Sequence, residues 1–144
     1  TGSVSVELAL AAPKGRVYAV ECDPDACALI RQNRAKFQTY NLTLIEGRAP
    51  DALADLPAPD AVFIGGTKGS MAAVVDTVLA KNANARICIA AIALESLSAA
   101  IAALTAHGLS AEVTQLAVSR TRPAGRLHLL TANNPIFLIT GERK

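Results

Sequence analysis

The chain has 144 residues, enough for one domain, and its 14 lysines and arginines nearly balance its 12 aspartates and glutamates. This balance argues against a surface dedicated to nucleic acid or to an acidic membrane. Hydrophobic residues make up 51% of the chain, so a core can form, whereas aromatic residues make up 3%, too few for a base-stacking platform. No apolar run is long enough to cross a bilayer, and three cysteines without metal-ligand spacing indicate a reducing, cytoplasmic compartment.

The N-terminal segment begins Thr1-Gly2, without a methionine and without a signal-peptide pattern. We therefore expect a fragment of a longer chain, and we treat residues 1–144 as one N-terminally incomplete domain. An alanine-rich run follows the glycine and is stopped at Pro13. It predicts a first helix that is entered through Thr1-Gly2.

Strand-like and helix-like runs then alternate along the chain. Short β-branched runs predict strands at 16–21, 42–46, 60–64 and 86–90, and runs with helical spacing predict helices at 25–38, 71–81 and 93–107. Asp23-Pro24 supplies a helix N-cap followed by a first-position proline, and Gly108 is a typical helix-ending glycine. Two last strands are expected at 112–119 and 136–140, joined by the polar stretch 120–134 and pairing antiparallel.

The alternation predicts an α/β fold, with a mostly parallel twisted sheet, helices on both faces and an antiparallel last strand. Ligands of such sheets bind outside the carboxyl ends of the strands. The functional residues should therefore directly follow each strand.

Two positions at the start of the chain are candidates for this edge. Gly2 at a helix entrance would let a ligand approach the backbone, and the helix N-terminus would favour an anion, although a cut chain end explains the same residues. Glu21 ends the first strand about twenty residues later, where dinucleotide-type folds place an acid that accepts hydrogen bonds from ribose hydroxyls. A surface glutamate beside a helix cap is the alternative.

Two later strand ends carry glycines. Gly47, in the segment 46–50, allows close backbone approach, so this loop could wall an adenine ring or could be a plain turn. Gly65 and Gly66 end a buried strand where an acceptor molecule would lie, and a structural turn is equally compatible with them.

Taken together, these stretches resemble the class I S-adenosylmethionine-dependent methyltransferases, which have a Rossmann-like fold. More closely, the chain is similar to the precorrin-6Y C5,15-methyltransferase (decarboxylating) family of cobalamin biosynthesis, in its C15-methylating domain. The matching stretches are 1–7, 15–21, 46–50, 60–66 and 134–137. The resemblance implies that the first strand of the sheet lies upstream of Thr1, and that a C12 acetate is lost during C15 methylation.

The resemblance also assigns a cofactor site to the strand ends. The residues implied for S-adenosylmethionine are Thr1, Gly2, Glu21, Cys22, Gly47, Arg48, Ala49 and Gly65. The first two would hold the methionine part, Glu21 the ribose, and the 47–49 loop the adenine. Arg48 stands where the family often carries an acidic residue, so a backbone contact is expected there.

A precorrin carries many carboxylates, so its site should offer cations. The residues expected to contact this tetrapyrrole substrate are Gly66, Arg120, Arg122, Arg126 and His128. A solvated basic hairpin is the alternative for the last four. No metal and no catalytic acid or base is assigned, and the resemblance implies a homo-oligomer, possibly a tetramer.

Three other classes of function stay open. An RNA methyltransferase similar to the tRNA adenine-N1 enzymes would have the same cofactor half, but the charge balance and the few aromatic residues count against it. A nicotinamide-dependent dehydrogenase would also use Glu21 on a ribose, and a non-catalytic binding domain would use neither cofactor. Titration with S-adenosylmethionine and with NAD separates the three.

Overall fold

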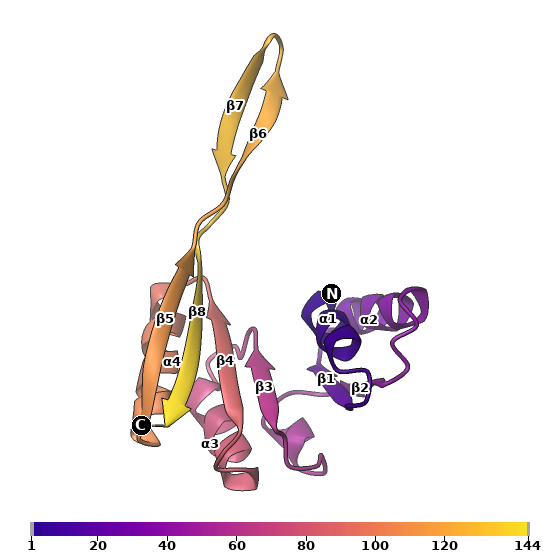
Figure 1. Ribbon diagram of the computed structural model, residues 1–144, viewed down its shortest axis with the longest axis vertical. Coiled ribbons are helices and arrows are strands. Elements are labelled where there is room, and N and C mark those ends of the chain that lie inside the picture. Colours follow the sequence, from indigo (N-terminus) through magenta and orange to yellow (C-terminus); the bar gives the residue numbers. More distant parts are fainter. Residues whose placement is uncertain (1, 144) are drawn as a thin grey trace. The chain divides into compact units, whose positions relative to one another are not determined.

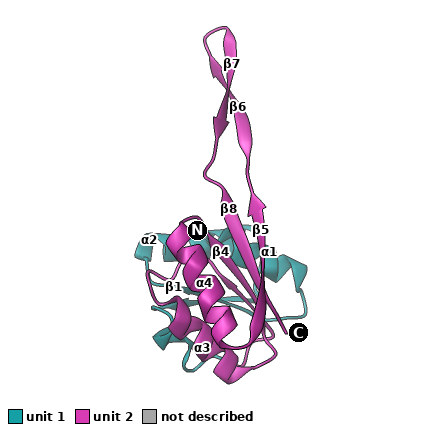
Figure 2. Cartoon of the chain, turned by 90° about the vertical axis from the view of Figure 1, so that its left-hand side faces the viewer, with its two compact units in different colours: residues 1–56 teal, residues 57–144 magenta. Residues whose placement is uncertain are grey.

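The computed structural model describes residues 2–143, and the chain consists of two compact units, residues 1–56 and 57–144 (Figure 2). Thr1, expected to hold part of a cofactor, lies outside the described residues. Within the described range, no helix is both long and apolar enough to cross a lipid bilayer.

The first unit is a short β-α-β arrangement preceded by a helix. Its elements are α1 (Ser3–Ala11), β1 (Val17–Glu21), α2 (Pro24–Lys36), β2 (Leu42–Glu46) and the 3-10 turn η1 (Asp51–Leu53). β1 and β2 pair in parallel along their whole length, from Val17 opposite Leu42 to Glu21 opposite Glu46. The core between them and the two helices is aliphatic, with Val6, Ile30 and Leu42 all buried.

The start of α2 confirms the prediction from Asp23-Pro24. The Asp23 carboxylate Oδ1 accepts the backbone N–H groups of Asp25 at 2.9 Å and Ala26 at 3.1 Å. Pro24 occupies the first helical position, where its missing N–H costs nothing. This cap fixes where the chain leaves β1.

The second unit is a four-stranded sheet with a hairpin. Its elements are β3 (Ala61–Ile64), α3 (Met71–Lys81), β4 (Arg86–Ala91), α4 (Leu94–Ala106), β5 (Leu109–Leu116), β6 (Ser119–Ala124), β7 (Leu127–Ala132) and β8 (Ile136–Arg143). The strand order is β3-β4-β8-β5, with β3 parallel to β4 and with β8 antiparallel to both of its neighbours. The predicted antiparallel last strand is confirmed, and β3, β4 and β5 all end at one edge of the sheet (Figure 1).

The helices of this unit, α3 and α4, lie on one face of the sheet (Figures 1 and 2). Leu104 of α4 is fully buried there, and a Cβ at Gly141 of β8 would lie 2.8 Å from its Cδ2 atom. A larger residue at position 141 would therefore force the Leu104 side chain to shift. Ile89 and Ile139, at the centre of β4 and β8, are completely buried.

The segment 119–132 contains two strands that the sequence did not predict. β6 and β7 pair antiparallel from Ser119 opposite Ala132 to Ala124 opposite Leu127, and β5 ends at Leu116 rather than at residue 119. The hairpin continues from the end of β5 and returns into β8 (Figure 1). The sequence did not predict these strands, because arginines and a proline give the segment a polar pattern. The tendency of a residue to form a strand depends strongly on its surroundings.

Candidate functional site

In the first unit, the parallel register brings two carboxylates to one edge. Glu21 ends β1, Glu46 ends β2, and the two residues are direct partners in the ladder. Cys22 and Gly47 come next on each strand. The predicted strand-end residues of this unit therefore lie beside one another, as the sequence predicted for parallel strands.

One oxygen of the Glu21 side chain is held by the turn that follows β1. Oε1 accepts the backbone N–H of Cys22 at 2.8 Å and that of Asp23 at 3.0 Å. Among residues 2–143, no group donates to the second oxygen, Oε2. A carboxylate fixed in this way can accept charge-assisted hydrogen bonds from the hydroxyl groups of a ligand without first losing rotamer freedom.

The backbone carbonyl of Glu21 is held from two further sides. It accepts the N–H of Gly47 at 2.9 Å and the thiol of Cys27 at 3.5 Å. Burial raises the pKa of the Cys27 thiol, and nearby Glu46 and Glu21 raise it further, so the thiol keeps its proton for donation. The contact between Cys27 and Glu21 has no signal in the sequence.

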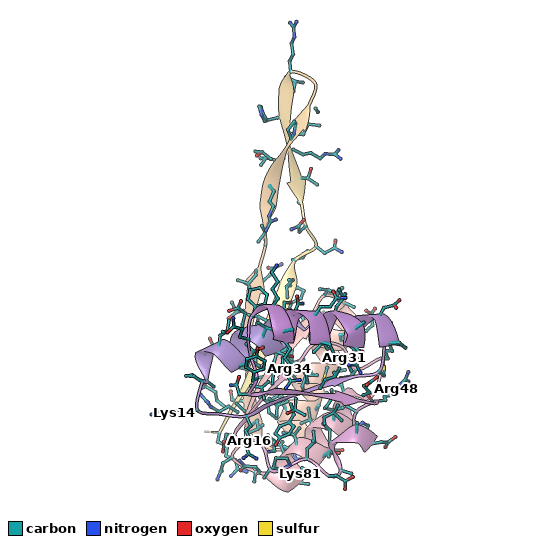
Figure 3. All side chains as sticks on the ribbon, turned by 90° about the vertical axis from the view of Figure 1, so that its right-hand side faces the viewer. Lys14, Arg16, Arg31, Arg34, Arg48 and Lys81 are labelled. Carbon is teal, nitrogen blue, oxygen red and sulfur yellow. The ribbon has the colours of Figure 1, made fainter. Side chains whose placement is uncertain are left out.

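The loop after β2 has one closely packed and one exposed residue. A Cβ at Gly47 would lie 2.9 Å from the Cβ of Ala52, so the loop folds tightly onto η1. Arg48 is exposed and Ala49 is half-buried. Arg31 of α2 forms an ion pair with Glu46, and Figure 3 labels Arg31 and Arg48 in this unit. This ion pair, which the sequence did not predict, leaves Glu21 as the available carboxylate of the edge.

Gly2 has a packing role that the sequence did not indicate. It caps α1 with φ +69°, and a Cβ there would lie 2.5 Å from Cγ1 of the buried Ile30 on α2. The N-terminus of α1 can therefore pack this closely against α2 only with a glycine at position 2, whether or not a ligand also approaches the backbone.

In the second unit, Gly65 and Gly66 follow β3 and are exposed. Neither has a positive φ. A Cβ at Gly66 would meet nothing within 4 Å, and one at Gly65 only a Phe63 ring atom at 3.9 Å. Internal packing and backbone conformation thus give no reason for glycine here, in contrast to Gly2 and Gly141.

The hairpin separates the four basic residues predicted to bind substrate. Arg120 and Arg122 lie two apart on β6 and share one face of the ribbon, because side chains alternate along a strand. His128 pairs with Pro123 and therefore lies on the opposite face. Arg126 lies in the turn between β6 and β7. All four are exposed, and Figure 3 shows side chains standing out along both strands.

In the part of the chain that the structure describes, no group of three or more histidine, cysteine or acidic side chains could hold a metal ion. The three cysteines, Cys22, Cys27 and Cys88, are free thiols.

A family profile described as "Precorrin methyltransferase domain" matches residues 1–143. A curated relative from Pyrobaculum calidifontis, named a probable cobalt-precorrin-6B C(15)-methyltransferase (decarboxylating), is 42% identical over 142 residues. The match covers 97% of this chain and 73% of the relative.

Solved structures give the same result. A precorrin-6Y C5,15-methyltransferase from Geobacter metallireducens superposes with a TM-score of 0.91 at 36% identity, covering 99% of this chain and 74% of that one. A precorrin-8W decarboxylase from Methanobacterium thermoautotrophicum superposes with a TM-score of 0.87 at 31% identity, covering 97% of this chain and 75% of that one. The α/β fold is therefore that of the class I methyltransferases, as the sequence predicted.

Proposed function

This chain belongs to the precorrin methyltransferase domain family, and from that premise we propose that it methylates C15 of a precorrin with decarboxylation of the C12 acetate. The methyl donor in this proposal is S-adenosylmethionine, and the pathway is cobalamin biosynthesis. When bound, the cofactor supplies an electrophilic methyl group on a sulfonium. The chain's own residues bind and orient the two reactants.

The observation that carries the proposal is the Glu21 carboxylate. Its Oε1 is fixed by two backbone N–H groups, and its Oε2 has no donor among residues 2–143. This arrangement fits the two hydroxyls of a ribose, since each charge-assisted bond contributes about 1.5–3 kcal/mol. Cys22 and Asp23 would orient the carboxylate through their backbone.

The remaining cofactor residues are those that membership of the family implies. We assign the methionine part to Thr1 and Gly2, and the adenine to the backbone of Gly47, Arg48 and Ala49. Gly65 is assigned to the transferring methyl group and Gly66 to the acceptor carbon, since a Cβ at Gly66 would meet nothing within 4 Å among the described residues.

Methyl transfer to an electron-rich carbon needs little acid or base assistance from the protein. Correct positioning of two reactants can lower a barrier by about 7–11 kcal/mol. Substrate positioning falls to the cations of the hairpin, some of Arg120, Arg122, Arg126 and His128, which would contact acetate or propionate groups. Loss of carbon dioxide also requires a proton at the carbon that remains, and no residue is assigned to deliver it.

We also propose a homo-oligomer in the cytoplasm, possibly a tetramer. A two-stranded ribbon alone is marginally stable in water, and Leu130, on the face of the β6–β7 hairpin away from Arg120 and Arg122, is 74% exposed. Association through this face would cover it. Three free thiols fit a reducing compartment. Light scattering of the full-length protein should give a multiple of the chain mass; a monomer would contradict this part of the proposal.

Calorimetric titration with S-adenosylmethionine and with NAD tests the cofactor assignment. The full-length protein should bind the first and not the second, and Glu21→Ala should weaken binding about tenfold or more, because hydrogen bonds to a charged group are lost. Glu7→Ala is the matched control, since Glu7 is an exposed acid on α1. Binding of NAD alone would contradict the methyltransferase proposal.

Mass spectrometry tests the reaction itself. The product formed from a precorrin should show one added methyl group and the loss of one carbon dioxide.

A further inference from the structure

The carboxyl edge of the second unit's sheet exposes large apolar side chains. Ile92, which directly follows β4, is 67% exposed; Leu116, the last residue of β5, is 46% exposed; and Ile136, the first residue of β8, is 40% exposed. Clustered apolar side chains on a surface commonly mark a binding site.

Strand register places these three residues in one row. Leu116 and Ile136 are direct partners across β5 and β8. Ala91 is the partner of Phe137 across β4 and β8, so Ile92, one residue on, continues at the level of Ile136. Because β8 lies between β4 and β5, the three residues form a row across the edge, called the apolar row below.

Two residues of the apolar row, Leu116 and Ile136, lie on the face of the sheet away from α4. Gly141 faces α4, since a Cβ there would meet Leu104 of that helix. Side chains alternate along a strand, so Ile136, five residues earlier on β8, points to the other face. Its cross-strand partner Leu116 points the same way, because directly opposed residues share a face.

Two other features share this edge. Gly65 and Gly66 follow β3, which runs parallel to β4 and ends on the same side. The hairpin starts just beyond Leu116 and carries Arg120 and Arg122 on one face. Between residues 113 and 141 the chain has three arginines and no acidic residue. The edge is therefore apolar at the sheet and cationic beyond it.

We propose, resting on the proposed function, that the apolar row is the floor on which the tetrapyrrole macrocycle lies, with carboxylates of its rim bound by Arg120 and Arg122. A broad, largely apolar ring with anionic substituents matches an apolar row flanked by unopposed cations. A second copy of this chain matches the edge less well, because it would bring the same arginines and no acidic groups from this segment. The row thus selects the substrate by its ring, and the arginines select it by its charge.

The arrangement also assigns separate roles to the two faces of the hairpin. Arg120 and Arg122 contact the substrate, whereas His128 lies on the other face and does not. This excludes His128 from the four basic residues proposed to contact the substrate.

Titration of the full-length protein with a water-soluble polycarboxylated porphyrin, followed by its fluorescence, tests the proposal. The variants are Ile92→Ser, Leu116→Ser and the double change Arg120→Gln with Arg122→Gln. Leu10→Ser is the matched control, because Leu10 is a 50% exposed leucine on α1 of the first unit. S-adenosylmethionine titration, circular dichroism and light scattering are run on each variant.

We expect Ile92→Ser and Leu116→Ser each to weaken porphyrin binding about tenfold, since a half-buried aliphatic contact is lost. The double arginine variant should weaken it at least as much, and the loss should shrink in high salt. Leu10→Ser should change it by less than about twofold, and His128→Gln should behave like this control. All variants should bind S-adenosylmethionine like the wild type.

Porphyrin affinity that stays at the wild-type value in Ile92→Ser and Leu116→Ser would overturn the proposal. A change of molecular mass in these variants would also overturn it, because the row would then be a contact between copies. A wild-type protein that binds S-adenosylmethionine but no polycarboxylated porphyrin would contradict the role of the apolar row and leave the proposed function standing. A wild-type protein that binds no S-adenosylmethionine would instead contradict the proposed function.

Discussion

The two units end their parallel strands in different ways. At the carboxyl edge of β1 and β2, Glu21 is held through its side chain and its carbonyl, and Glu46 is paired with Arg31. At the edge of β3, β4 and β5, Gly66 has open space beside it and Ile92 is mostly exposed.

Under the proposed function, this difference suits the two edges to two kinds of ligand. A rigid polar edge gains affinity for a small ligand with hydroxyls, because the protein groups are already oriented. An open apolar edge accommodates a large ring, whose contacts are mainly non-directional. Substitutions at residues that differ in packing or hydrogen bonding test this comparison.

The largest effect is expected from glycines with opposite surroundings. Gly2→Ala should lower the free energy of unfolding by about 3 kcal/mol, because it adds strain at φ +69° and a clash with the buried Ile30. Gly66→Ala should change stability by less than about 0.5 kcal/mol, yet reduce methyl transfer. Urea unfolding measures the free energy of unfolding of both variants. Equal losses of stability in Gly2→Ala and Gly66→Ala would contradict the expected difference between the two glycines.

A smaller effect is expected where α2 begins. Asp23→Ala removes the cap of α2 and should cost about 1 kcal/mol of stability. The variant keeps the backbone N–H of residue 23 that holds Glu21, but loss of the cap loosens the turn that carries this N–H, so affinity for S-adenosylmethionine should fall several-fold by calorimetry. Asp23→Ser, which can still cap the helix, should restore both values. A loss of stability with unchanged affinity would show that the cap does not orient Glu21.

The smallest effect is expected from the surface ion pair. Arg31→Gln breaks the contact with Glu46, but both side chains are more than half exposed, so stability should change by less than about 0.5 kcal/mol. Thermal unfolding at low and at high salt measures it. A loss comparable to that in Asp23→Ala would mean that Glu46 is held as firmly as Glu21.

The sequence predicted those parts of the fold that depend on local chemistry. Asp23-Pro24 marked the start of α2, and the alternation of runs predicted parallel strands with Glu21 at an edge. It did not predict β6 and β7, because a ribbon exposed on both faces lacks the apolar alternation of a half-buried strand.

For the candidate sites, the sequence indicated which residues lie at strand and helix ends, but not the contacts that these residues make. Gly2 was expected to admit a ligand, and its contact with Ile30 depends on how two helices meet. The apolar row could not be predicted either, since it joins residues from three strands whose order, β4-β8-β5, does not follow the chain.

The full pairing of β5 with β8 has a consequence for proteolysis. Trypsin should cut the exposed hairpin after Arg120 and Arg126, whereas the bond between Arg122 and Pro123 resists it. Both cuts fall between two strands that stay hydrogen-bonded over eight residue pairs, from Leu109 opposite Arg143 to Leu116 opposite Ile136. A nicked protein would therefore keep its C-terminal strand in the sheet and migrate as one species until it is denatured.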